Sequence, residues 1–110
     1  MATAYKVLGQ SNPAATTATA LYTVPAATEA VVSTIVICNQ DAADATYRVS
    51  VRPDGATLAA QHYLAYDVTV GASDSTTLTL GITLDATDVL EVYASTTTVS
   101  FNAFGSEITA

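Results

Sequence analysis

The sequence predicts an all-β fold, an antiparallel β-sandwich of the jelly-roll or immunoglobulin-like type with about eight strands. Apolar and polar residues alternate with a period of two in several segments, as they do in half-buried strands. β-Branched residues dominate, and no window shows the spacing of an amphipathic helix. Turn-forming residues recur roughly every 8 to 15 residues and separate the apolar runs, a spacing typical of sandwiches.

The first two strands are expected near 3–9 and 19–24, with Pro25 ending the second. Between them, the stretch Ala14–Ala20 contains only Ala and Thr. It fits either a flexible arm or a strand whose small side chains make a tight contact. Residues 1–18 are therefore a candidate extended arm.

The third strand, 29–39, is apolar on both faces. Strict alternation puts Val31, Ile35 and Ile37 on one face, with Val32, Val36 and Cys38 on the other. Such a strand is either central and covered on both sides, or has one face in an interface with another protein.

The fourth and fifth strands, 45–52 and 62–70, alternate more simply. In the fourth, Arg48 and Arg52 share the face opposite Tyr47 and Val49. In the fifth, one face is predicted to be apolar and Tyr63 to point the other way; the apolar row is Leu64, Tyr66, Val68 and Val70.

The last strands are expected near 76–84, 88–95 and 98–104. The segment 76–84 has the clearest alternation in the chain and predicts one continuous half-buried strand; its apolar row is Leu78, Leu80, Ile82 and Leu84. The segment 88–95 is apolar on both faces, which again indicates a central strand.

Length and composition favour a single domain spanning residues 1–110. The apolar share of the chain is 50%, but Ala and Thr fill more than a third of all positions, so a core of small side chains is expected. Such a core buries less area per residue, which makes stabilisation by association plausible.

Charge is sparse and one-sided, because Lys6, Arg48 and Arg52 oppose ten acids for a net charge of −7. Binding to nucleic acid or to an anionic membrane requires clustered Lys and Arg, so neither partner is expected. Repulsion between acidic surfaces serves solubility. The first residues lack the apolar core of a secretory signal, and no apolar stretch has the length of a membrane span.

Residues for catalysis are scarce. His62 is the only histidine and Cys38 the only cysteine, and Cys38 lies in an apolar run where it is expected to act as a small hydrophobe. No nucleophile elbow, phosphate loop or dinucleotide motif occurs. We therefore predict that the chain is not an enzyme and uses no cofactor.

The paired acids Asp41/Asp44 and Asp85/Asp88 fall in tight turns. Aspartate is common there because its carboxylate binds nearby backbone N–H groups, although such acids could also ligate calcium. Zinc would need more Cys and His ligands than the chain has. No metal site is predicted.

Three residues are candidates for protein contact. Tyr63 is the best candidate for an exposed anchor, because tyrosine provides a large contact area at low entropic cost. Arg48 and Arg52 are expected to pair with carboxylates, either within the chain or on a neighbouring subunit.

Nearly the whole chain resembles small virion structural proteins of tailed bacteriophages, cyanophages especially. The resemblance lies in short segments: 8–10, 32–39, 47–49, 51–55, 62–67 and 101–108, with Leu-Tyr-Thr-Val-Pro-Ala at 21–26 the most specific. It implies a β-sandwich subunit, frequently trimeric, that decorates or cements the capsid or belongs to the tail.

From this resemblance we expect a homo-oligomeric virion protein that contacts the major capsid protein or tail proteins. It would be assembled in the host cytoplasm and carry no catalytic residues. A tail, baseplate or fibre component is one alternative, and a receptor- or carbohydrate-binding module is another.

Overall fold

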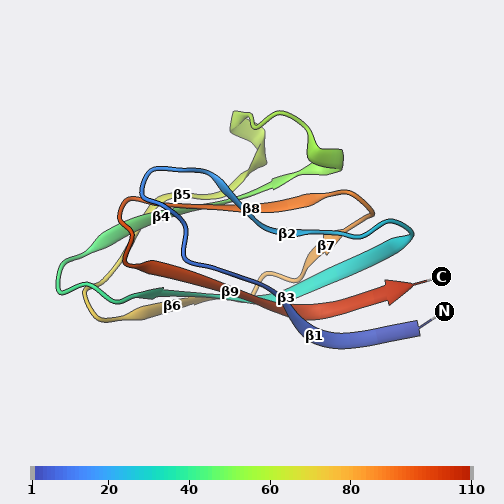
Figure 1. Ribbon diagram of the computed structural model, residues 1–110, viewed down its shortest axis with the longest axis horizontal. Helices are drawn as coiled ribbons and strands as arrows, with labels where there is room; N and C mark the ends of the chain where they lie inside the picture. Colours follow the sequence, from blue (N-terminus) through green and yellow to red (C-terminus); the bar gives the residue numbers. More distant parts are fainter. Residues whose placement is uncertain (1, 110) are drawn as a thin grey trace.

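The computed structural model describes residues 2–109 and confirms the all-β sandwich (Figure 1). Two antiparallel sheets face each other. The first sheet has the order β1-β9-β3-β6, with β7 also pairing with β3; the second has the order β2-β8-β4-β5. The strands are β1 (Ala2–Ser11), β2 (Thr19–Thr23), β3 (Thr28–Asn39), β4 (Ala45–Arg52), β5 (Tyr63–Val70), β6 (Ser75–Leu78), β7 (Ile82–Leu84), β8 (Val89–Ala94) and β9 (Val99–Thr109).

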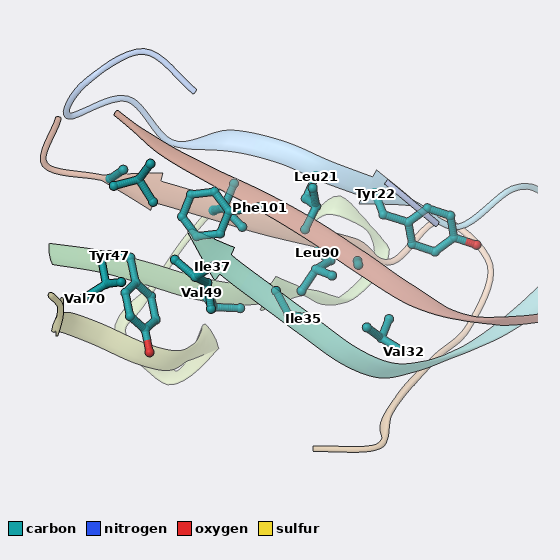
Figure 2. Close-up of a cluster of buried hydrophobic side chains, with 14 of the residues drawn as sticks. Leu21, Tyr22, Val32, Ile35, Ile37, Tyr47, Val49, Val70, Leu90 and Phe101 are labelled. Atoms are coloured by element: carbon teal, nitrogen blue, oxygen red, sulfur yellow. The ribbon is translucent and has the colours of Figure 1, made fainter. Parts of the chain in front are cut away.

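The core lies between the two sheets, and its largest side chains come from central strands (Figure 2). Ile37 of β3 and Phe101 of β9 meet Tyr47 of β4 and Leu90 of β8, all of them fully or almost fully buried. The Tyr47 ring lies edge-on to Phe101, with ring centroids 6.4 Å apart and planes at 73°. Such aromatic pairs add stability beyond the area that they bury.

β1 is an edge strand and not a loose arm, since it pairs with β9 from Ala2 to Ser11. The Ala/Thr stretch that follows β1 in the sequence is irregular until β2 begins at Thr19. It crosses to the second sheet, where the Thr16 N–H donates to the Ala94 carbonyl of β8 at 2.8 Å.

β3 lies in the middle of the first sheet, but the predicted assignment of its faces is wrong in one half. Val32, and not Val31, shares the core face with Ile35 and Ile37. The cause is a bulge at Ser33, because an extra residue reverses the alternation.

Both neighbours of β9 in the sheet, β1 and β3, have a bulge beside Phe104. In β1 the register shifts at Leu8, between the β9 partners Phe104 and Ala103. In β3 it shifts at Ser33, between the β9 partners Gly105 and Phe104. A Cβ atom at Gly105 would lie 1.9 Å from the carbonyl oxygen of Val31, so only glycine fits there. β9 itself keeps its alternation and runs to Thr109, beyond the predicted end at 104.

The predicted continuous strand 76–84 is wrong, since it is divided into β6 and β7, end to end along β3. Gly81, with φ of +64°, turns the chain between them. Leu80 is therefore 54% exposed and does not continue the row that ends in the buried Leu84.

The predicted apolar row of β5 is also wrong. Val70 is buried, but Leu64, Tyr66 and Val68 are exposed, and Ala65 faces the core instead. A bulge causes the change: Tyr47 pairs with Val68 while Val49 pairs with Ala65, so β5 has one residue more than β4 between these pairs.

The short helical elements connect β4 to β5, at Pro53–Gly55 and Ala60–His62. Among residues 2–109, no helix is long and apolar enough to cross a membrane.

Candidate functional site

Arg48 is the centre of a cluster on the outer face of the second sheet. Its guanidinium carbon lies 4.1 Å from the ring centroids of both Tyr66 and Tyr93. Its Nε donates to Oδ1 of Asp67 at 2.7 Å, and a second guanidinium nitrogen donates to Oδ2 at 3.3 Å. The hydrogen bond to Asp67 raises the pKa of Arg48 above its ordinary value. Arg48 thus finds its predicted carboxylate partner within the chain.

Two features of the backbone build this cluster. Arg48 and Tyr93 are directly opposite each other on β4 and β8, so their side chains share a face. Asp67 has φ of +51° in the β5 bulge, which places it and Tyr66 beside Arg48.

Tyr63 lies next to this cluster, with a ring centroid 4.9 Å from that of Tyr66 and the planes at 90°. The prediction that the two tyrosines point to opposite faces is therefore wrong, and the bulge again explains why. Tyr63 is half-buried, whereas Tyr66 is 56% exposed. Together with Leu58, Ala59 and Ala60 they line a shallow groove of about 490 Å³, which we name the tyrosine groove.

Arg52 faces the same side of β4 but belongs to a separate contact. One terminal nitrogen donates to Glu91 at 3.2 Å, and the other donates to the carbonyls of Gly55 and Ala56 at 3.1 and 3.0 Å. Arg52 thereby fastens the turn after β4 to β8. Its contacts within residues 2–109 are structural.

The aspartates accept hydrogen bonds from backbone N–H groups, as predicted for acids in turns. Asp88 accepts from Asp54 and Asp85, and Asp44 accepts from Ala72. Within residues 2–109, no three Asp, Glu, His or Cys side chains gather as a metal site would require. The buried His62 accepts a hydrogen bond from the Ala59 N–H through Nδ1, and this contact stabilises the short helical element Ala60–His62.

A second surface covers the outer face of the first sheet, and we name it the β1 face. It carries Tyr5 (87% exposed), Val7 (46%) and Phe104 (37%), with Val31 beside them. The register accounts for this grouping, since Tyr5 and Val31 both pair with Ser106, and Val7 pairs with Phe104. Sequence reasoning did not select these residues, although the alternation of Tyr5 and Val7 was visible.

One polar cluster joins the two sheets near the start of β1. Glu107 of β9 accepts from Lys6 Nζ of β1 at 2.8 Å and from the Tyr22 hydroxyl of β2. Hydrogen bonds from Lys6 and Tyr22 lower the pKa of Glu107. Burial, together with the neighbouring carboxylate, raises the pKa of Tyr22.

Comparison with protein-family models and with curated proteins finds no match for this chain.

Proposed function

We propose that the chain is a structural subunit of a phage virion, foremost a capsid cement or decoration subunit that stabilises the particle by protein–protein contacts. The observation that carries the proposal is the β1 face. Tyr5 stands 87% exposed on a regular strand, next to Val7 and Phe104. Contiguous apolar side chains exposed on a rigid sheet are typical of an interface with another protein.

Two further features support a structural role. Each of the three basic side chains forms an ion pair with an acid of the same chain. The resemblance to small phage virion proteins supplies the class of assembly, with the major capsid protein or tail proteins as partners.

The test is quantitative mass spectrometry of purified virions whose genome encodes the chain. A copy number comparable to that of the major capsid protein supports the cement role. A copy number that matches tail proteins would replace it with the tail, baseplate or fibre alternative. Absence from the virion would overturn both.

The tyrosine groove favours a second candidate, a receptor- or carbohydrate-binding module. Exposed tyrosine rings can stack on sugar rings, and Tyr66 offers such a surface beside Leu58. A glycan array would decide this: saturable binding that Tyr66→Ala abolishes and Leu80→Ala leaves intact would support the module. An array without specific binding would count against it.

A further inference from the structure

The first half of β1 has an unoccupied edge. Within residues 2–109, β1 pairs only with β9, and every residue from Ala2 to Val7 is exposed. The second half is different, because Gly9 approaches β2 of the other sheet. A Cβ there would lie 2.1 Å from the Leu21 carbonyl oxygen. The free edge is therefore the segment Ala2–Val7.

This edge lacks the devices by which proteins usually prevent strand pairing. Such devices are short length, bulges, proline and unpaired charge. The edge formed by β6 and β7 is interrupted at Gly81, β2 is five residues long with a register shift, and β5 has its bulge at Asp67. Ala2–Val7 is regular, and its one charge, Lys6, is bound by Glu107.

Charge also distinguishes this segment from the rest of the chain. All ten acids lie between Glu29 and Glu107, so the first 28 residues contain none. Two copies of a chain with a net charge of −7 repel each other over most of their surface. A contact between two β1 strands therefore brings no carboxylate of β1 against another.

We propose that Ala2–Val7 pairs antiparallel with the same segment of a second copy, so that the first sheets of the two copies form one continuous sheet. The proposal deepens the proposed function, because it rests on a role in protein contacts and names one contact. Pairing of a strand with itself is two-fold and gives dimers, in place of the trimers that the resemblance implies.

The side chains favour one register. Opposite residues of an antiparallel pair share a face, so Tyr5 can lie across from Tyr5 of the second copy. This register puts Lys6 opposite Ala4 and Thr3 opposite Val7. A register centred on Lys6 would oppose two like charges, which is unfavourable.

Cysteine cross-linking tests the pairing directly. In a Cys38→Ser background, Tyr5→Cys is compared with Leu80→Cys, since Leu80 is also exposed but distant from β1. Opposite residues in an antiparallel pair have Cα atoms about 4.5 to 5.5 Å apart, within the range of a disulfide. Mild oxidation should give covalent dimers with Tyr5→Cys and few with Leu80→Cys. Equal yields from the two variants would overturn the proposal.

Light scattering on Tyr5→Glu and Leu80→Glu provides the second test. The wild-type chain and Leu80→Glu should have twice the monomer mass of 11.3 kDa. Tyr5→Glu should raise the dissociation constant by roughly tenfold or more, because two carboxylates would meet in a desolvated contact. Far-UV circular dichroism checks that each variant is folded.

The possible failures are distinguishable. A wild-type trimer that Tyr5→Glu leaves intact would overturn the pairing of β1 but not the proposed function. A wild-type monomer at micromolar concentration would also overturn the pairing, whereas the copy number in virions would still decide the proposed function.

Discussion

Each basic residue of the chain is held by an acid that lies far from it in the sequence. Lys6 pairs with Glu107, Arg48 with Asp67, and Arg52 with Glu91. These pairs connect different strands and, through the Tyr22–Glu107 hydrogen bond, the two sheets. Exposed ion pairs contribute little by themselves, so their effect depends on the additional contacts that each one makes.

For Arg48 the additional contacts are the two tyrosine rings. We predict that Arg48→Lys lowers the melting temperature and weakens the near-UV circular dichroism of the tyrosines. Lysine cannot present a planar group to both rings or make the paired hydrogen bonds to Asp67. Lys6→Arg is the matched control, because it keeps the charge at the Glu107 pair. Equal effects of the two variants would contradict this account.

For Glu107 the additional contact is Tyr22, and it makes stability depend on pH. The pKa of Glu107 is lower in the folded than in the unfolded chain, so its ionised form adds stability above the ordinary carboxyl range. That contribution is lost as the pH falls through the folded-state pKa. We predict that Glu107→Gln is less stable than wild type at neutral pH, and that the difference shrinks below about pH 4.

Urea unfolding over a range of pH measures this difference. Tyr22→Phe removes one of the two hydrogen bonds and should cost about 1 kcal/mol at neutral pH. A gap between wild type and Glu107→Gln that stayed constant down to acid pH would argue against the role of Glu107.

The bulges beside β9 determine which side chains of the first sheet face the core. Both bulges adjoin Phe104: the one in β1 lies between the partners of Phe104 and Ala103, and the one in β3 lies between the partners of Gly105 and Phe104. Because Gly105 has no side chain, the backbone of Val31 on β3 can lie close to the backbone of β9 at this position.

We predict that Gly105→Ala destabilises the fold by about 2 kcal/mol or more, since the obstructing atom is backbone and cannot rotate away. Gly71→Ala is the control, because its nearest neighbour would lie at an ordinary 3.6 Å. Chemical denaturation of both variants measures the effect. A cost below about 0.5 kcal/mol for Gly105→Ala would show that the strands adjust freely.

The positions of the strands were largely predictable from the sequence. Which side chains face the core was predictable only where no bulge or turn interrupts the alternation of the strand. In β4, Tyr47 and Val49 face the core and Arg48 faces outward, as expected. The errors in β3 and β5 begin at bulges, and that in 76–84 at Gly81. A bulge arises from the fit between neighbouring strands, so the residues of one strand do not reveal it.

The candidate site shows the same division. The sequence suggested Arg48 and Tyr63 as candidates, because a rare cation and a tyrosine on strands are conspicuous. It did not identify Asp67 and Tyr66 as their neighbours, because these positions depend on the β5 bulge. The sequence did not indicate Tyr5, because the exposure of its side chain depends on β1 being an edge strand, and the order of strands in a sheet is not visible in the sequence.

For the molecule as a whole, excess negative charge opposes folding. Three of the ten acids are paired with the three basic residues. The other seven form no ion pair with a side chain in the part of the chain that the structure describes, and their number equals the net charge of −7. Seven carboxylates without a cationic partner repel one another across a small sandwich.

We therefore predict that the melting temperature rises as sodium chloride is increased from about 0.01 M to about 0.15 M, where the screening length falls to about 8 Å. The charge-reversing variant Asp74→Lys should reduce this dependence. Scanning calorimetry at low protein concentration measures both. A melting temperature that falls with salt would mean that attractive pairs dominate.

The pairing of β1 with β9 has a mechanical consequence. Ala2 lies opposite Thr109, so a force applied to these two residues acts on one end of the ladder. It would open the hydrogen bonds between β1 and β9 one after another, whereas a force along the strands would load all of them together. The sandwich should therefore resist a force between Ala2 and Thr109 less than a force that pulls β1 and β9 past each other.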